Sequence, residues 1–419
     1  MSGTDVVVCG AGVGGLATAC ALGGLGLRVL LVDKQPEIRP VAKGEVFQPG
    51  SLPVLRAWGV AGHLETAGAL RLDRLVARDP DGTARMTLDY GLLPAGGGNW
   101  LLAHDYPAIL RAFTDALPPS AELRRGTVVD DLLGAADGRV TGVRLRDGEE
   151  VKAALVVAAD GISSRLRRAA GLDVERLEYP HRLVAMELTD APDVDPDFSA
   201  YVTPRGLRLR YALPGGRVRL YAQVAPDELR GADESRLASW VAGLVRDTPA
   251  LAPLQEAMRA AVPRRQTLPV ARALAPQLTV PGLALVGDSG HVVHPMAAQG
   301  MNSAVADAHC LAELVGRCGE LTAAAVDHAL LGYGRRRHAD LTLVGRTSHN
   351  AARMVTDLSW AGRLLGQRAL RHTGANARIR YTVMHNMAGL GAHPLTPLDR
   401  LHQIGLLPDP RARQQPAWA

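Results

Sequence analysis

The first apolar run of the chain predicts a buried strand. Val6–Cys9 is continuously apolar, as is typical of a parallel strand covered on both faces. A glycine-rich turn follows at Gly10–Gly15. Leu16–Leu25 then has the composition of a helix with small residues on its packing face, and Gly26 is placed to end it. Arg28–Val32 is a second apolar strand, so the chain begins with a β-α-β unit.

Further along the chain the hydrophobic period changes to two. Residues 71–90 alternate apolar and polar positions and predict a hairpin. Gly126–Asp131 and Glu150–Ala159 are predicted strands. Leu207–Leu213 and Arg217–Val224 also alternate, across a Pro-Gly-Gly turn, which predicts a hairpin within an antiparallel sheet.

The remaining segments complete an α/β organisation. Helices are expected at about 233–262, a buried strand at Leu283–Val286, and a largely helical region from about 300 to 372. We therefore predict a Rossmann-like dinucleotide-binding domain with an inserted antiparallel-sheet domain and a helical C-terminus. The expected boundaries are residues 1–75, 100–178 and 273–315 for the first domain, 76–99 and 179–272 for the sheet domain, and 316–419 for the helical region.

The charge does not indicate nucleic-acid binding. The formal net charge is +5 and the isoelectric point about 9.2, but the excess is scattered arginine without a basic block, and aromatic residues make up only 4%. The four cysteines lack the spacing of a metal site or a disulfide framework, so we expect no metal. No signal peptide or membrane-spanning segment is expected, which favours a cytoplasmic enzyme without stable membrane insertion.

The glycine-rich turn matches the G-x-G-x-x-G pattern of dinucleotide-binding proteins. Its residues are Gly10, Ala11, Gly12, Val13, Gly14 and Gly15. The first glycine permits the tight turn, the second lets the backbone approach a pyrophosphate, and the third lets the helix pack close to the strand. Asp33, 23 residues after Gly10, is placed to accept the ribose hydroxyls of an adenosine. This acid favours FAD or NAD over NADP at the site.

Two later motifs place an aspartate where a strand ends. Asp160-Gly161 follows an apolar run and precedes Ser and Arg residues, which also suits a capped strand–turn–helix with no ligand. Asp288 follows the strand at Leu283–Val286, and a helix is expected to begin near Gly300. The amides of such a helix start can bind a carbonyl edge that becomes anionic on reduction.

In this order and at these separations, the three motifs resemble those of the group A FAD-dependent monooxygenases, the p-hydroxybenzoate hydroxylase family of aromatic hydroxylases. The resemblance covers residues 5–315. It implies the following cofactor-binding residues: Gly10–Gly15 and Asp33 for the ADP half of FAD, Asp160 and Gly161 for FAD and the transient nicotinamide cofactor, Asp288 for the ribityl chain, and Gly300, Met301 and Asn302 for the flavin pyrimidine ring. Lys43 stands where the family often has an FAD-contacting arginine, and Lys34 and Arg39 lie near the expected nicotinamide path, which suggests NADPH.

The chain departs from the family at two places. Ala297-Ala298 replaces a glycine that many members have, which would stiffen or narrow the loop beneath the flavin ring. His104-Asp105-Tyr106 stands where the family has an arginine, and the residue that replaces this arginine is not evident from the sequence. His291 and His294 flank the flavin loop, but without a third ligand His291 is interpreted as a structural hydrogen-bonding residue.

The resemblance implies an enzyme that uses NADPH or NADH and O₂, through a flavin C4a-hydroperoxide, to oxygenate a small aromatic or polyketide-like substrate in bacterial secondary metabolism such as antibiotic biosynthesis. Candidate substrate residues are Tyr201, Arg210, Tyr211, Tyr221 and Pro295; no catalytic base is assigned. An FAD-dependent reductase, a halogenase and a non-catalytic flavin-binding relative remain alternatives. The substrate, the nicotinamide preference and the oligomeric state are not legible in the sequence.

Overall fold

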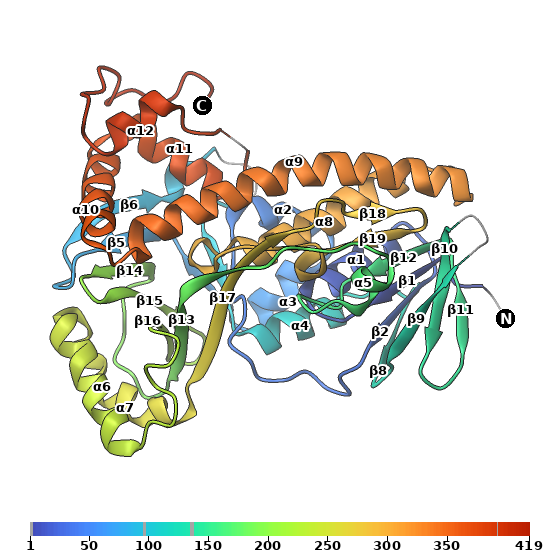
Figure 1. Ribbon diagram of the computed structural model, residues 1–419, viewed down its shortest axis with the longest axis horizontal. Helices are drawn as coiled ribbons and strands as arrows, with labels where there is room; N and C mark the ends of the chain where they lie inside the picture. The colour runs from blue at the N-terminus through green and yellow to red at the C-terminus, as the bar shows by residue number, and fades with distance from the viewer. Residues whose placement is uncertain (1–2, 95–97, 135–137, 392) are drawn as a thin grey trace.

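A parallel β-sheet forms the centre of the N-terminal domain. The computed structural model describes residues 3–94, 98–134, 138–391 and 393–419 (Figure 1). The sheet order is β18-β19-β12-β1-β2-β8. These strands are β1 (Val6–Cys9), β2 (Val29–Asp33), β8 (Ala121–Arg125), β12 (Leu155–Ala158), β18 (Thr279–Val280) and β19 (Leu283–Leu285). All pairings are parallel except that of β18 with β19, so the predicted Rossmann-like fold is confirmed.

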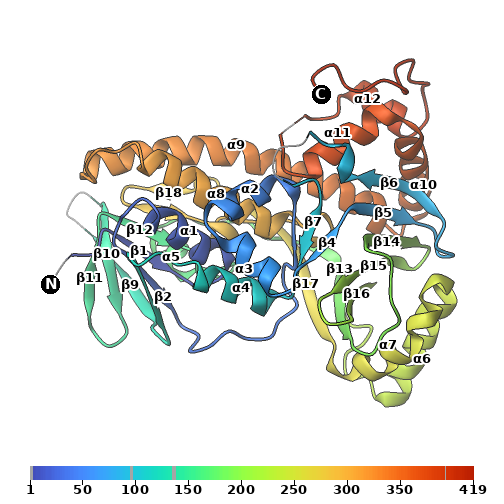
Figure 2. The same cartoon turned by 180° about the vertical axis from the view of Figure 1, so that it is seen from behind.

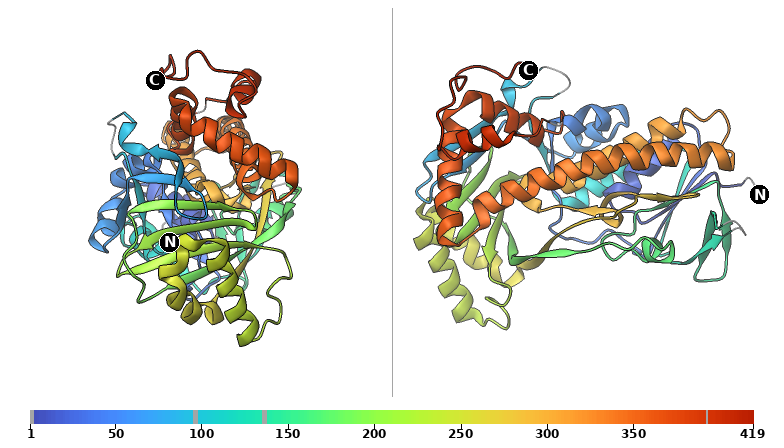
Figure 3. Two further views of the ribbon diagram at one scale, coloured as in Figure 1. Left: turned by 90° about the vertical axis from the view of Figure 1, so that its left-hand side faces the viewer. Right: turned by 45° about the horizontal axis from the view of Figure 1, so that its top comes forward.

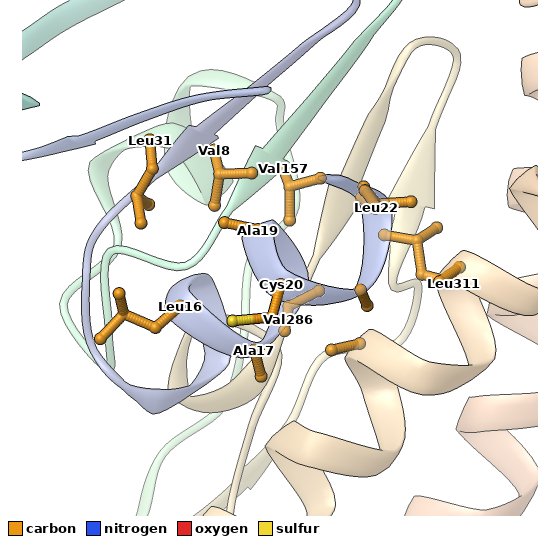
Figure 4. Packing of buried hydrophobic residues seen from close by; sticks show 14 of the residues in the cluster. Val8, Leu16, Ala17, Ala19, Cys20, Leu22, Leu31, Val157, Val286 and Leu311 are labelled. Carbon is orange, nitrogen blue, oxygen red and sulfur yellow. The ribbon is translucent and has the colours of Figure 1, made fainter. Parts of the chain in front are cut away.

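The helix after the glycine turn packs its small residues against this sheet. α1 (Val13–Gly23) starts earlier than the predicted Leu16 because the last glycines already have helical geometry. Ala19 lies close to Val8 and Val157 of the sheet, and Leu22 lies close to Leu311 of α8 (Gln299–Val315) (Figure 4). Small side chains let α1 approach both the sheet and α8, which brings the glycine turn close to the strand ends.

Two predicted strands have the wrong bounds, because each runs across a break between elements. The segment Gly126–Asp131 spans the turn between β8 and β9 (Val129–Gly134), since Gly126 has a φ of +69°. The segment Glu150–Ala159 is two strands in different sheets. β11 (Glu150–Lys152) pairs with β10 (Val140–Leu145) in a three-stranded sheet, and β12 enters the parallel sheet. Continuous apolar patterning does not reveal where the backbone changes partners.

An eight-stranded sheet forms the second domain, in the order β20-β17-β13-β16-β15-β14-β5-β6. Its strands are β5 (Arg74–Arg78), β6 (Ala84–Asp89), β13 (Leu177–Leu188), β14 (Asp197–Thr203), β15 (Gly206–Leu213), β16 (Arg217–Val224), β17 (Gln266–Leu274) and β20 (His291–Val292). Both predicted hairpins, β5–β6 and β15–β16, are confirmed by their antiparallel pairing. The pairing of β17 with β20 joins this sheet to the first domain.

Helices cover both faces of the eight-stranded sheet. α6 (Glu234–Asp247) and α7 (Gln255–Ala261) pack on one face and share a core with Tyr201 (Figure 2). The opposite face, here called the inner face, carries Tyr211 and Tyr221 and packs on residues of α9, α10 and α11. The predicted helical region from 300 is interrupted twice. Its helices are α8, α9 (Ala323–Thr356) and α10 (Trp360–Ala375), followed by α11 (Ala377–Met387) and α12 (Pro397–Gln403).

The long helix α9 runs along both domains and links them (Figures 1 and 3). The Tyr333 hydroxyl on α9 donates to the carbonyl of Leu285 in β19, while Val355 near its C-terminal end enters the inner-face core. The other elements are β3 (Val46–Phe47), β4 (Leu70–Leu72), β7 (Leu101–Ala103), α2 (Leu52–Ala57), α3 (Val60–Thr66), α4 (Tyr106–Asp115) and α5 (Arg165–Ala169).

Candidate functional site

The glycine turn is compressed so tightly that Gly10 and Gly15 have no room for a side chain. Gly10 has a φ of +110°, and a Cβ there would lie 2.4 Å from the carbonyl oxygen of Ala159. A Cβ on Gly15 would lie 1.8 Å from the Gly10 oxygen. At Gly12, by contrast, a Cβ would meet only the Tyr106 hydroxyl, at 3.6 Å. The Gly12 backbone is therefore open to close approach, and among the described residues no side chain caps α1 there.

Asp33 lies against this turn at the end of β2. Its carboxylate accepts hydrogen bonds from the amides of Ala11, at 2.5 Å, and Gln35, at 2.6 Å. A carboxylate has about four acceptor positions, so two remain for hydroxyl donors. The neighbouring Lys34 is exposed, as is Arg39. The turn and Asp33 together have the geometry expected for an adenosine diphosphate moiety.

Lys43, Tyr106 and Asp288 come from three distant segments and meet beside the turn. The Lys43 ammonium lies 2.8 Å from the Asp288 carboxylate, which raises the pKa of Lys43. Burial raises the pKa of Tyr106, and the nearby Lys43 charge opposes this shift. Tyr106 begins α4, where the family has an arginine in the preceding turn. Its hydroxyl faces Gly12, so this neutral side chain fills the space beside the loop.

Asp160 acts as a cap for a short helix. Its carboxylate accepts from the Ser164 hydroxyl at 2.5 Å and from the Arg165 amide at 2.8 Å. Gly161 has a φ of +86°, which turns the chain from β12 into α5. The structural interpretation of this motif is therefore confirmed, while its contact with FAD or a nicotinamide cofactor stays a prediction.

A buried carboxylate that sequence analysis missed holds the Gly-Asp motif. Asp307 on α8 is fully buried, and it accepts from the Gly287 amide at 2.9 Å, His291 Nε2 at 2.6 Å and Arg337 Nε at 2.8 Å. Burial alone would raise the pKa of Asp307, but His291 and Arg337 lower it to about 2. The expected structural role of His291 is confirmed, because it connects this strand end to α8.

The start of α8 is shaped by a residue in the left-handed region. Ala298 has a φ of +50°, a conformation that costs a residue with a Cβ about 1–2 kcal/mol and explains why glycine is common there in the family. The Asn302 amide donates to the carbonyls of Ala298 and Val46 and accepts from the Gln48 amide and the Ser51 hydroxyl. Its side chain therefore fastens α8 to segment 46–51. The backbone amides of Gly300 and Met301 lie before the first intrahelical hydrogen bond of α8, so they can donate to a ligand. The contact of Asn302 with the flavin ring stays a prediction.

Two buried histidines hold the loop before α8. His294 Nδ1 accepts the Met296 amide at 3.1 Å, so neutral His294 carries its proton on Nε2, which lies 3.1 Å from Nε2 of His181. His181 must then accept through Nε2. Burial, with smaller effects of His181 and His349, lowers the pKa of His294 to about 3, and burial also lowers the pKa of His181. The pair is thus stable only while both rings are neutral.

Acid should therefore destabilise the protein through these histidines. A folded-state pKa below the unfolded value of about 6.5 leaves stability intact above pH 6.5 and removes it as pH falls, by at most about 1.4 kcal/mol per pH unit for each proton. His181→Gln keeps an acceptor for His294 and removes one titrating ring, so we expect a shallower slope between pH 6.5 and 5 in urea unfolding. His328→Gln, at an exposed position on α9, is the control. Equal slopes for His181→Gln and the unaltered protein would contradict this assignment.

The inner face of the eight-stranded sheet carries a buried ion pair that the sequence did not reveal. The Glu45 carboxylate accepts from Arg219 Nη2 at 2.7 Å and Nε at 2.9 Å, and from the Tyr211 hydroxyl at 2.7 Å. The Tyr221 hydroxyl lies 3.5 Å from the same carboxylate. Burial and then Glu45 raise the pKa of Tyr211, so its hydroxyl remains a donor. The positive charge of Arg219 is therefore neutralised by the carboxylates of Glu45 and Glu187.

The proposed substrate residues divide between the two sheet faces. Tyr211 and Tyr221 lie on the inner face in the same core as Met296, which follows the exposed Pro295 in the loop before α8. Tyr201 and Arg210 lie on the opposite face, since Tyr201 packs with α6 and α7 and Arg210 bonds Asp197 and Ser199. Strand alternation separates the two sets, and the structure does not bring the second set to the flavin loop.

A cavity of about 110 Å³ opens beside Asp288. Arg167 and Arg176 line it from the segment after Asp160, and Gly290 and His291 line it from the other side. The cavity therefore connects the two aspartate motifs and has a cationic wall. In the part of the chain that the structure describes, no cluster of three or more histidine, cysteine or acidic side chains could hold a metal ion. Nor is any described helix long and apolar enough to cross a membrane.

Comparison with known proteins agrees with this geometry. A family model described as "FAD binding domain" matches residues 3–347. The chain is similar to 6-methylpretetramide 4-monooxygenase of Streptomyces rimosus, with 31% identity over 73% of each protein. It is also 25% identical to 3-demethoxyubiquinol 3-hydroxylase of Escherichia coli, over 80% of this chain and 86% of that protein. The structure of P. aeruginosa PqsL in complex with 2-aminobenzoylacetate matches with a TM-score of 0.76 and 26% identity, covering 85% of this chain and 98% of that chain.

Proposed function

Because this chain belongs to the FAD-binding-domain family of flavin-dependent monooxygenases, we propose that it uses NADPH or NADH and O₂ to oxygenate a small aromatic or polyketide-like substrate. The observation that carries the proposal is the meeting of the open glycine turn, Asp33, the Lys43–Asp288 pair and the uncapped start of α8. These groups lie on the side of the parallel sheet where strands end, which is where α/β proteins bind dinucleotides.

The residues of this site fit FAD. The Gly12 backbone and the α1 N-terminus would hold the pyrophosphate, and Asp33 would accept the ribose hydroxyls. Lys43 would add a positive charge near the phosphates, and Asp288 would accept from the ribityl chain. The amides at Gly300 and Met301 would donate to the pyrimidine edge of the ring. Bound there, FAD would supply hydride acceptance and the activation of O₂.

The protein's own residues would then orient the substrate and exclude water. The inner face is mostly apolar, with Leu209, Tyr211 and Met296 in one buried core. Tyr211 and Tyr221 are held by Glu45, so their hydroxyls stay protonated and directed. With Arg219 paired to Glu45, this face suits an aromatic ring with hydroxyl or carbonyl groups. The relative named for 6-methylpretetramide and the PqsL complex with 2-aminobenzoylacetate support this substrate class. The first of these comes from Streptomyces rimosus, which supports a role in secondary metabolism.

The deciding experiment is an absorbance spectrum of the purified protein, followed by rapid mixing of the NADPH-reduced protein with O₂. We expect bound flavin, and NADPH oxidation that speeds up with a suitable aromatic compound and gives one oxygenated product per NADPH. The alternatives predict other outcomes. Reoxidation that no aromatic compound changes would indicate a reductase or oxidase, and a halide-dependent product a halogenase. A colourless protein that takes up no FAD would overturn every flavoenzyme interpretation.

Removal of the Lys43 charge should weaken FAD binding with little effect on folding. The Lys43 side chain is 58% exposed, so its pair with Asp288 contributes at most about 1 kcal/mol to stability. For Lys43→Met we expect an FAD dissociation constant raised about tenfold, as for the loss of one charge-assisted contact of about 1.4 kcal/mol. Titration of apoprotein with FAD measures this, with Lys152→Met, at an exposed position on β11, as control. If Lys43→Met binds FAD as tightly as the unaltered protein, Lys43 does not contact FAD.

A preference for NADPH would require a cation near its extra phosphate. Arg39 is exposed and follows Asp33 and Lys34 on the same segment, outside the glycine turn. If it contacts the 2′-phosphate, Arg39→Ala should raise the KM for NADPH by about tenfold or more, with little effect on the KM for NADH. Steady-state oxidation of both cofactors checks this. An unchanged KM for NADPH would show that Arg39 does not bind the 2′-phosphate, and the cations that line the cavity, Arg167 and Arg176, would then be tested.

A further inference from the structure

The positive charge of the protein is concentrated in its last segment. Residues 358–419 contain eight arginines, no lysine, two aspartates and no glutamate, which leaves a net charge of +6. The whole chain has a net charge of +5, so the remaining residues are close to neutral. Neither the FAD site nor the inner face of the sheet uses this charge, because Lys43 and Arg219 lie outside the segment.

The same segment exposes most of the large apolar side chains on the described surface. Of the fifteen exposed ones in the described residues, ten lie within residues 358–419. Trp360 is 74% exposed, and Leu364 and Leu365 are 45% and 47% exposed on α10. Leu406 and Leu407 follow α12 with 62% and 44% exposure. Single exposed leucines need no explanation, but such a concentration marks an interaction surface.

α10 and the turn after α12 lie next to each other, which brings these side chains to neighbouring parts of the surface. Trp360, Leu364 and Arg368 are four residues apart, so they follow one face of α10. Arg368 donates to the carbonyls of Ile404 at 2.8 Å and Gly405 at 3.0 Å, which ties this face to the turn that carries Leu406. α10 forms the outer edge of the molecule at the end away from the parallel sheet (Figures 1 and 3). Trp360, Leu364, Leu365, Leu406 and Leu407 are called the C-terminal stripe below.

Charge decides which partner suits the C-terminal stripe. Arg363 and Arg371 are exposed beside it on α10. The two acidic residues of the segment, Asp399 and Asp409, both pair with Arg378, at 2.6 and 2.7 Å. Asp357, just before the segment, accepts the Ser359 amide at the start of α10. The surface therefore presents tryptophan and leucine together with unbalanced arginine, the composition of helices that lie in the interface of an anionic bilayer.

We propose that the C-terminal stripe docks this protein on the surface of a membrane that contains anionic lipids. α10 would lie along the headgroups, with Trp360 and the leucines at the acyl boundary and Arg363 and Arg371 on lipid phosphates. A second copy of the chain fits less well, because two faces of this composition would bring like charges together. The docking is independent of FAD chemistry and needs no membrane-spanning helix.

Flotation of the FAD-loaded full chain with vesicles tests the proposal. Vesicles of phosphatidylcholine alone are compared with vesicles that hold about one third phosphatidylglycerol, at salt concentrations of about 0.05 and 0.5 M. We expect binding to the anionic vesicles at low salt, and weaker binding to neutral vesicles and at high salt. Trp360→Ser/Leu364→Ser/Leu365→Ser should lower the partition coefficient at least about tenfold. Arg363→Gln/Arg371→Gln should lower it about fivefold per arginine.

Matched controls separate the surface from general hydrophobicity. Leu25→Ser and Leu331→Ser change leucines of similar exposure, 49% and 57%, far along the chain from the stripe, and should leave vesicle binding unchanged. Melting temperature and the flavin spectrum verify that the triple variant is folded. The proposal is overturned if the folded protein does not bind anionic vesicles at low salt, or if the triple variant binds them as strongly as the unaltered chain. If the unaltered protein is a dimer that binds no vesicles, and the triple variant is a monomer, the surface serves self-association instead.

Discussion

Gly15→Ala should abolish flavin binding and severely destabilise the protein. In an ordinary helix the change from glycine to alanine stabilises by up to about 1 kcal/mol. Here the added Cβ would lie 1.8 Å from the Gly10 oxygen and 3.3 Å from the Ala159 Cβ. Both neighbours belong to strand ends of the parallel sheet, so α1 must move away from the sheet. We expect a loss of more than about 4 kcal/mol in the free energy of unfolding.

The measurement is the flavin content of purified Gly15→Ala together with its urea unfolding curve. Gly62→Ala on α3 is the matched control, because nothing lies within 4 Å of its added Cβ and its φ is not positive. Propensity alone should make this control as stable as the unaltered protein or slightly more so. A Gly15→Ala protein that retains flavin and stability would show that the turn is less compressed than the structure indicates.

Asp307→Ala should be the most damaging change outside the glycine turn. It leaves His291 and Arg337 and the Gly287 amide buried without their shared acceptor. Breaking a buried ion pair by removing one partner costs about 3–5 kcal/mol. The strand end that carries Asp288 should also loosen, so we expect weaker FAD retention. Because the pKa of Asp307 is about 2, its contribution is complete above about pH 4 and is lost only as pH falls through 2.

Urea unfolding between pH 5 and 8 should show a constant deficit for Asp307→Ala. The control is Asp340→Ala, which removes the other partner of Arg337 at a side chain that is 47% exposed and should cost less than about 1 kcal/mol. In the double variant Asp307→Asn/Arg337→Met, neither buried charge remains, so part of the loss should be recovered. If Asp307→Ala is as stable as Asp340→Ala, Asp307 does not hold the motif.

The first β-α-β unit could be predicted from the sequence because its determinants are local. Apolar runs mark β1 and β2, and the spacing of the glycines between them predicts a tight turn. Asp33 lies beside this turn because it stands at the end of β2. The hairpin of β15 and β16 was predicted for the same reason, since alternation and a Pro-Gly-Gly turn lie within one short segment. The family follows from motifs of this kind, and the match over residues 3–347 confirms it.

The errors arose where a local pattern is compatible with two structures. The pattern of Glu150–Ala159 does not show that its two halves join different sheets. Alternation in β15 separates Arg210 from Tyr211, but the sequence does not show which set faces the loop before α8. That choice depends on where α6, α7 and the C-terminal helices pack, and these segments are distant in the chain.

By itself, the sequence determined the fold class, the glycine turn with Asp33 and the family, because each depends on the type and spacing of neighbouring residues. Only the tertiary structure decided the pairs that complete the site. Glu45 with Arg219, Asp307 with His291 and Arg337, and His181 with His294 bring together residues from separate elements. The physical reason is that a buried charge or imidazole needs a hydrogen-bonding partner, and the packing of separate elements supplies that partner. The periodic pattern along the chain does not show which residue this partner is.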